Sequence, residues 1–151
     1  MPVSAEEISR RCDRFSQALR ASGFRLTHQR LEVVRVLAAS ETHPDAEEVF
    51  RAVRERVPTI SLDTVYRTLG TLADLGLASR VSGITGAARF DGNTDHHHHF
   101  ICTRCDAIHD IESAELDALL PPGSASQHGQ VGSVEVRFRG VCRECAPRDH
   151  A

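Results

Sequence analysis

Apolar positions in the first half of the chain recur at helical spacing, first at Ile8, Cys12, Phe15 and Leu19. This stripe predicts an amphipathic helix over residues 5–21 that ends at Gly23. Similar stripes predict three more helices, and a side chain suited to capping precedes each of them: Thr27, Asp45 and Ser61. The first half of the chain is therefore expected to be mainly helical.

Two short strands are expected after the fourth helix, which Gly76 should end. They cover residues 77–81 and 87–90, and the glycine-rich turn SGITG joins them. Helices followed by a small hairpin are typical of a winged helix-turn-helix, in which one helix enters the major groove of DNA. A helical bundle with a terminal hairpin is the alternative that this pattern leaves open.

The second half of the chain has a different pattern. The polar segment GNTDHHHH leads into a predicted hairpin over residues 100–111, which a CxxC interrupts. A short helix is expected over 113–120, and a loose stretch rich in Gly and Ser follows it. Val134, Val136 and Phe138 then alternate with charged residues, which predicts a strand with one buried face before a second CxxC.

Composition and charge narrow the class of protein. The 151 residues are 40% hydrophobic and carry a net charge of −3, an ordinary globular balance. Residues 1–90 hold 13 Arg and 11 acidic residues, whereas residues 91–151 hold 5 Arg and 10 acidic residues, and Lys is absent. Without a membrane span or a signal peptide, a cytoplasmic protein is expected. In that compartment the five cysteines favour metal binding over disulfides.

Four of the cysteines form two CxxC motifs, 36 residues apart: Cys102, Cys105, Cys142 and Cys145. Four thiolates make a tetrahedral site that suits structural Zn²⁺. A pair of redox dithiols is the alternative, but a thioredoxin-like CxxC would begin a helix in a βαβ unit, and neither motif has that setting. The fifth cysteine, Cys12, lies on the apolar stripe of the first helix and is expected to be buried.

Imidazoles and carboxylates form a second group of candidate ligands, which suits Fe²⁺, Mn²⁺, Co²⁺ or Zn²⁺. In an extended strand, His97 and His99 share one face, while His96 and His98 share the other. Asp110, on the return strand, can reach the face of His97 and His99. The alternative is a solvated histidine tract that binds metal loosely. His109 points to the other face, and the isolated His128 and His150 are expected to carry no function.

A zinc enzyme, such as a hydrolase or a deaminase, is another class of protein with cysteine and histidine ligands. A nucleobase deaminase needs H-x-E and P-C-x-x-C, and the chain has neither motif. Four cysteine ligands would also leave no open position on the zinc for water. The sequence is therefore not expected to encode an enzyme.

Five segments in order along the chain resemble those of the Fur (ferric uptake regulator) family of dimeric, metal-dependent bacterial repressors: RLTHQRLEVVRVLAASETHPDAEEVF, SLDTVYRTLGTLADLGL, ARFD, HHHHFICTRCDAIHDI and GVCREC. The resemblance covers nearly the whole chain. It implies an α+β fold, with a winged-helix DNA-binding domain over residues 1–90, a hinge over 91–95 and a metal-binding dimerisation domain over 96–151.

The resemblance also implies the roles of the site residues. The four CxxC cysteines would hold structural zinc, and a regulatory Fe²⁺ or Mn²⁺ would be bound by His43, Asp91, His97, His99 and Asp110. Operator DNA would be contacted by the helix from Ser61 through Thr64, Tyr66 and Arg67, with Arg25 and Arg30 on phosphates. For Tyr66, a core position beside Val65 and Leu69 is the alternative. The implied partners are double-stranded operator DNA and a second copy of the chain, with no membrane.

Within the family, the chain is most similar to the peroxide-sensing PerR branch. PerR proteins have Asp at the position of Asp110, where iron regulators typically have Glu. The resemblance implies that iron-catalysed oxidation of His43 or His97 releases the metal, and that the Mn²⁺ form is insensitive to peroxide. A regulator of iron, zinc or manganese uptake with reversible metal binding is the alternative. His28 stands where the family often has Pro, and Ser133 and Val134 stand where it often has His, which argues against a further site at His96 and His98.

Overall fold

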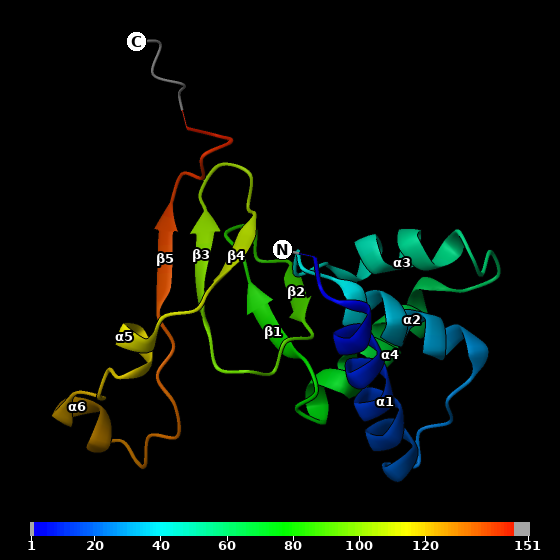
Figure 1. The fold of residues 1–151 in the computed structure, drawn as a ribbon, viewed down its shortest axis with the longest axis horizontal. Helices are drawn as coiled ribbons and strands as arrows, with labels where there is room; N and C mark the ends of the chain where they lie inside the picture. The colour runs from blue at the N-terminus through cyan, green and yellow to red at the C-terminus, as the bar shows by residue number, and fades with distance from the viewer. Residues whose placement is uncertain (1, 147–151) are drawn as a thin grey trace. The chain divides into compact units, whose positions relative to one another are not determined.

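The computed structural model describes residues 2–146, which form two units (Figure 1). The N-terminal unit extends to Thr94, and the C-terminal unit begins at Asp95. Among the described residues, no helix combines the length and the apolar character that a membrane crossing requires.

Four helices make up most of the N-terminal unit: α1 (Ala5–Ala21), α2 (His28–Ala39), α3 (Ala46–Arg54) and α4 (Leu62–Asp74). The predicted caps of the last three helices are confirmed. The side chains of Thr27 and Ser61 each accept a hydrogen bond from a backbone N–H in the first turn of their helix. Asp45 and Glu48 form a reciprocal capping box at the start of α3. Local sequence therefore determines where these helices begin.

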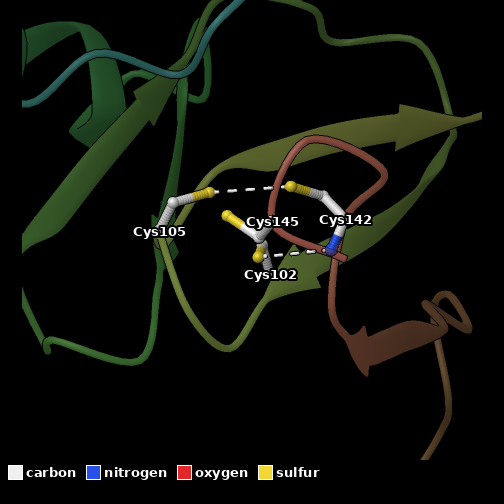
Figure 2. Close-up of side chains that lie close together, drawn as sticks. All are labelled: Cys102, Cys105, Cys142 and Cys145. Atoms are coloured by element: carbon white, nitrogen blue, oxygen red, sulfur yellow. Dashed lines mark hydrogen bonds between the residues drawn. The ribbon is translucent and has the colours of Figure 1, made fainter. Parts of the chain in front are cut away.

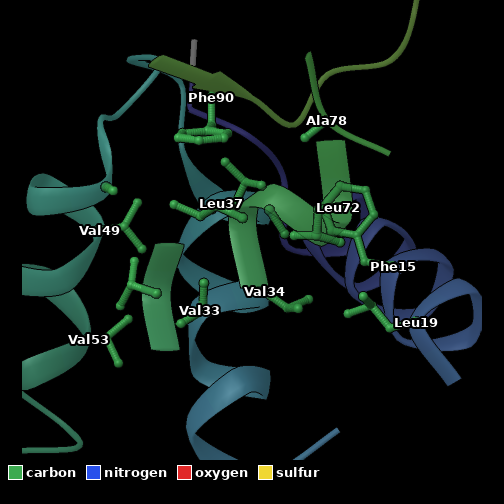
Figure 3. Packing of buried hydrophobic residues seen from close by; sticks show 14 of the residues in the cluster. Phe15, Leu19, Val33, Val34, Leu37, Val49, Val53, Leu72, Ala78 and Phe90 are labelled. Atoms are coloured by element: carbon green, nitrogen blue, oxygen red, sulfur yellow. The ribbon is translucent and has the colours of Figure 1, made fainter. Parts of the chain in front are cut away.

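The core of this unit lies around α2 (Figure 3). Val33, Val34 and Leu37 of α2 are fully buried, and α2 packs against α1, α3 and α4. Each side chain of this size contributes about 1.5–3 kcal/mol on burial. From α4, Leu69 and Leu72 enter the same core and are fully buried. The opposite side of α4 is consequently left toward solvent.

A two-stranded antiparallel sheet, β1 (Ser79–Ser82) and β2 (Ala88–Asp91), completes the unit. Both strands begin and end slightly later than the sequence predicts. The loop before α3 holds β2 in place, since the N–H of Phe90 donates to the carbonyl of Pro44 over 3.0 Å. Asp91, the first residue of the predicted hinge, is the buried last residue of β2.

A three-stranded sheet in the order β4-β3-β5 forms the centre of the C-terminal unit. The hairpin of β3 (His98–Cys102) and β4 (Ile108–Ile111) is confirmed, and β5 (Arg137–Gly140) runs parallel to β3. Register pairs His99 with Asp110 across the hairpin and with Arg137 on the other side. His99 of the middle strand therefore lies between the carboxylate residue Asp110 of β4 and the basic residue Arg137 of β5.

Three details of this unit differ from the sequence prediction. The helix expected over 113–120 is a single turn, α5 (Ala114–Asp117), because it buries no residue and two prolines follow it. The loose stretch contains another turn, α6 (Gly123–Ser126), which the sequence did not predict. The buried strand face through Val134, Val136 and Phe138 was wrong: β5 begins at Arg137, and Phe138 is 41% exposed, because β5 is an edge strand.

Candidate functional site

The four CxxC cysteines come together in the C-terminal unit (Figure 2). Cys102 ends β3 and Cys105 follows in the turn to β4, while Cys142 and Cys145 lie in the turn after β5. Since β3 and β5 are parallel neighbours, both turns leave the sheet at the same end. The N–H of Thr103 donates to the carbonyl of Gly140 over 2.7 Å and holds the two turns together.

The sulfur positions fit one tetrahedral zinc ion. All four Sγ atoms lie within 4.8 Å of one another, and those of Cys105 and Cys142 are 3.8 Å apart. Zn–S bonds of about 2.3 Å place the sulfurs of a tetrahedral site about 3.8 Å apart. Four ligands of this type close the coordination sphere, which is the arrangement of a structural site.

Backbone hydrogen bonds prepare one of these sulfurs to carry negative charge. The N–H groups of Cys105 and Cys142 lower the pKa of the Cys102 thiol to about 6, and the N–H of Cys142 lies 3.3 Å from its sulfur. Hydrogen bonding to Cys105 and Cys142 instead raises the pKa of Cys145 to about 12. Four thiolates so close together therefore need a cation, and Zn²⁺ would supply that charge.

The N-terminal unit holds two of the predicted regulatory ligands side by side. His43 Nε2 lies 3.1 Å from Asp91 Oδ2, and both side chains are buried. His43 has a positive φ of 51°, a conformation that residues other than glycine seldom adopt outside turns and functional sites. The other oxygen of Asp91 accepts a hydrogen bond from the N–H of Asn93 over 2.8 Å, which fixes the carboxylate. An oxygen and a nitrogen at this separation can bind adjacent positions of one divalent metal.

The C-terminal unit brings together the other three predicted ligands. His97 and His99 share one face, with ring centroids 4.7 Å apart. Asp110 Oδ1 lies 3.4 Å from His97 Nε2 and 3.6 Å from His99 Nε2. The alternation of faces that the sequence predicts is therefore observed. Two imidazoles and one carboxylate make a donor set typical of Fe²⁺, Mn²⁺ or Zn²⁺.

Both imidazoles of this triad are oriented through their other nitrogen. His97 Nδ1 lies 2.6 Å from the carbonyl oxygen of Asp95, and His99 Nδ1 lies 3.1 Å from Glu135 Oε1. An Nδ1–H that donates to these oxygens leaves the lone pair on Nε2, the atom that faces Asp110. Sequence reasoning missed Glu135, because only tertiary structure brings it to His99. Burial raises the pKa of Glu135, but hydrogen bonds from Arg137 and His99 lower it by more than burial raises it. The pKa of Glu135 is therefore below its usual value.

A further cluster lies on the other face of β3. His96 and His98 gather with Asp117 of α5, which the sequence analysis did not single out. His98 is fully buried, its Nδ1 accepts a hydrogen bond from the N–H of Val136 over 3.1 Å, and its Nε2 lies 3.1 Å from Asp117 Oδ1. A ring that accepts at Nδ1 carries its hydrogen on Nε2 when neutral. His98 therefore links β3, α5 and the segment before β5.

Three other described candidates, His109, His128 and Cys12, lie outside these clusters. His109 is exposed, with its ring 6.4 Å from that of Phe100, and His128 is exposed as well. His150 lies outside the described residues. Cys12 is half-buried against the helical core, and burial raises the pKa of its thiol. A raised pKa makes a thiol a poor nucleophile at neutral pH, so Cys12 fits a packing role.

The solvent side of α4 presents the residues that we associate with DNA. Tyr66 is 52% exposed, so the core position that the sequence left open for it is wrong. Arg67 is also exposed. At the start of the helix, Ser61 Oγ accepts from the N–H of Thr64 over 3.1 Å and lies 2.9 Å from the Thr64 hydroxyl. The helix therefore exposes the phenol of Tyr66 and the guanidinium of Arg67, and both follow an N-terminus that Ser61 caps.

The turn before α2 is fixed by its own contacts. Arg30 donates to the carbonyl of Arg25, and its guanidinium lies 4.2 Å from the centre of the Phe24 ring. Gln29 donates to the Thr59 hydroxyl over 3.3 Å, which ties the start of α2 to the turn before α4. The Arg30 side chain is therefore held at the start of α2, and the start of α2 is tied to the turn before α4.

Comparisons with known proteins agree with this architecture. Residues 21–138 match the Ferric uptake regulator family. The chain is 32% identical to the peroxide-responsive repressor PerR of Staphylococcus aureus over 145 residues, which cover 96% of this chain and 98% of that protein.

Solved structures give the same fold. The Helicobacter pylori ferric uptake regulator Fur, described as having three functional metal binding sites, matches with a TM-score of 0.79 and 23% identity over 99% of both chains. A zinc-bound manganese uptake regulator matches with a TM-score of 0.68 and 29% identity over 85% of this chain and 98% of that one. A zinc uptake regulator in complex with zinc and DNA matches with a TM-score of 0.62 and 23% identity, over 91% of this chain and 94% of that one.

Proposed function

Because this chain belongs to the ferric uptake regulator family, we propose that it is a metal-dependent repressor that binds operator DNA as a homodimer and responds to peroxide. The curated relative that shares 32% of its residues is a peroxide-responsive repressor. The proposal assigns DNA binding to residues 1–90, a hinge to 91–95 and dimerisation to 96–151. It places the protein in the cytoplasm and gives it no enzymatic role.

The observation that carries the proposal is the pair of incomplete donor sets in the two units. His43 and Asp91 supply one imidazole and one carboxylate, and His97, His99 and Asp110 supply two imidazoles and one carboxylate. Five such ligands together satisfy Fe²⁺ or Mn²⁺, whereas either set alone leaves several coordination positions to water. One metal bound by both sets would fix the two units relative to each other, and metal binding would then be coupled to DNA binding.

The peroxide response is assigned to histidine. Peroxide would be the oxidant: as its O–O bond breaks, one oxygen atom would pass to a ring carbon of His43 or His97 and the other would leave as water. Bound Fe²⁺ would supply the redox chemistry for this step, and the oxidised imidazole would lose its capacity to bind metal. The four cysteines, with zinc bound, would be slower to oxidise than free thiolates. Loss of a ligand would release the metal and, with it, the operator.

The proposed DNA contacts follow from the N-terminal unit. Tyr66 and Arg67 on the exposed side of α4 would contact bases, with Ser61 and Thr64 at the start of the helix. Arg25, in the turn before α2, and Arg30, whose side chain packs on Phe24, would bind phosphates. Arg is well suited to both roles, since its guanidinium can form two parallel hydrogen bonds to guanine or phosphate.

The test compares the Fe²⁺ and Mn²⁺ forms of the zinc-loaded protein. A binding sequence is first selected from randomised duplex DNA, and binding is then measured before and after modest peroxide treatment. We expect the Fe²⁺ form to lose DNA binding as about 16 Da is added to a peptide that contains His43 or His97, and the Mn²⁺ form to change in neither respect.

A regulator of metal uptake with reversible metal binding is the second candidate, favoured by the 29% identity to a manganese uptake regulator. It predicts metal-dependent DNA binding that peroxide leaves intact. If peroxide instead releases zinc and oxidises the cysteines while both histidines remain unmodified, the peroxide-sensing proposal is wrong. If neither metal promotes DNA binding, the repressor proposal fails.

A further inference from the structure

An ion pair on the solvent side of α4 joins Asp63 to Arg67. Arg67 Nε lies 2.9 Å from Asp63 Oδ2, and the two side chains are 73% and 71% exposed. The residues are one helical turn apart, so both project from the same side of α4. Tyr66, the exposed aromatic residue of this helix, precedes Arg67. An acidic residue therefore stands within the surface that we propose for DNA contact.

The ion pair leaves the two terminal nitrogens of the Arg67 guanidinium available for hydrogen bonds. An arginine has five N–H donors, and the ion pair engages the one on Nε. The two terminal nitrogens remain as a planar fork, whose geometry matches O6 and N7 of guanine. With Nε held by Asp63, fewer rotamers remain open to Arg67, and less conformational freedom is lost when the fork binds.

Asp63 has a different effect on DNA. A carboxylate can only accept hydrogen bonds, and the phosphates that border the groove repel it. The base edges of the major groove offer it two donors, the N4 amino group of cytosine and the N6 amino group of adenine. Approach of α4 to DNA is therefore penalised where Asp63 faces guanine or thymine and compensated where adenine or cytosine turns its amino group toward Asp63.

We propose that Asp63 is a specificity-determining residue for DNA recognition. It orients Arg67 toward a guanine and selects, beside that guanine, a base that presents an amino group in the major groove. The inference rests on the proposed function, because it requires α4 to enter the major groove. It adds a negatively charged residue to a surface otherwise defined by Tyr66, Arg67 and the cap.

A purely structural role for Asp63 makes a different prediction. An acidic residue in the first turn of a helix interacts favourably with the helix dipole, and an i,i+4 ion pair supports the helix. Replacement would then lower thermal stability and leave base preference unchanged. Glu7 of α1 offers a matched control, since it also lies in the first turn of its helix and pairs at i,i+4 with Arg11, over 2.8 Å.

The experiment selects binding sites from randomised duplex DNA with the zinc-loaded, Mn²⁺-loaded full-length protein and its variants. For Asp63→Asn we expect the preference for cytosine beside the guanine to be lost, since an amide can still pair with adenine. Binding to random DNA should rise about threefold, because a negative charge near the phosphates is removed. The ratio of selected to random affinity should fall about tenfold. Arg67→Ala should lose the guanine preference, and Glu7→Gln should keep the wild-type sequence and ratio.

Thermal unfolding of each variant separates folding from recognition. Asp63→Ala provides a second variant in case the asparagine destabilises the helix, and it should lose the preference for both adenine and cytosine, because alanine has no hydrogen-bonding group. If both Asp63 variants select the wild-type sequence with an unchanged ratio to random DNA, or if Glu7→Gln shifts that ratio equally, the specificity role is overturned while the repressor proposal stands. If the metal-loaded wild-type protein enriches no sequence, both fail.

Discussion

His43 Nε2 lies 3.1 Å from Asp91 Oδ2, although 48 positions separate these residues in the sequence. The contact exists because β2 is hydrogen-bonded to the loop before α3, through the N–H of Phe90 and the carbonyl of Pro44. The left-handed backbone of His43 turns its side chain within that loop. The winged-helix fold thus builds an imidazole–carboxylate pair at the end of its last strand.

Replacement of His43 should remove the regulatory metal and leave the structural zinc bound. We expect His43→Ala to lose the regulatory metal and metal-dependent DNA binding while it keeps one zinc per chain, because the cysteine cluster lies wholly in the other unit. Metal content by mass spectrometry and DNA binding with added Mn²⁺ test this expectation. His128→Ala, at an exposed position, is the control and should behave like the wild type. Loss of zinc from His43→Ala would contradict the assignment of separate sites.

Replacement of Cys102 should remove the zinc and destabilise the C-terminal unit. The sulfur of Cys102 accepts from the N–H groups of Arg104 and Cys142, so it joins both turns even before metal binds. We expect Cys102→Ser to contain no zinc and to be monomeric in analytical ultracentrifugation, since binding of structural zinc stabilises the folded state. Cys12→Ser should retain both zinc and the dimer. A zinc-free Cys102→Ser protein that remains a folded dimer would disprove the structural role.

Glu135 should support metal binding without being a ligand. Its carboxylate lies 3.1 Å from His99 Nδ1 and orients the ring. Loss of such a partner typically lowers metal affinity about 10–100-fold, and we expect Glu135→Gln to fall in this range for Mn²⁺. Calorimetric titration of the zinc-loaded protein measures the change. Glu112→Gln, at an exposed position, should leave the affinity unchanged, and equal effects of both variants would argue for a general charge effect.

The length of the acidic side chain at position 110 should influence the peroxide response. Asp110 lies opposite His99 in the register of β3 and β4, so a longer side chain would displace its carboxylate from both imidazoles. We expect Asp110→Glu to keep Mn²⁺-dependent DNA binding and to slow histidine oxidation in the Fe²⁺ form. Peptide mass analysis after timed exposure to peroxide measures the rate. Unchanged oxidation in this variant would remove Asp110 from the explanation of peroxide sensing.

The helical core sets the stability of the N-terminal unit. Leu69 of α4 is fully buried, and Leu69→Ala should reduce the free energy of unfolding by about 2–5 kcal/mol through loss of burial and the cavity left behind. Leu75, which is 40% exposed, serves as the control and should lose less than about 1 kcal/mol. Urea unfolding followed by circular dichroism tests both variants. Similar losses would show that α4 is not anchored through Leu69.

Much of the helical unit could be predicted from sequence, because helix starts and stops are local. Thr27, Asp45 and Ser61 cap their helices through backbone N–H groups three residues away. The four cysteines and the alternating histidines could be predicted too, since turn geometry and the two-residue period of a strand are also local properties. Strand ends and short helical turns in the second unit could not, because little burial supports them.

The sequence by itself determined the residue types of each site: four thiolates for zinc, a mixed set of imidazoles and carboxylates for a second metal, and arginines for DNA. Tertiary structure decided which partners meet. The parallel pairing of β3 and β5 brings the two CxxC turns together, and the chain before β5 carries Glu135 to His99. Tertiary packing also turned Tyr66 toward solvent. These contacts join residues distant in sequence, and their energies depend on burial and strand pairing, which no local pattern encodes.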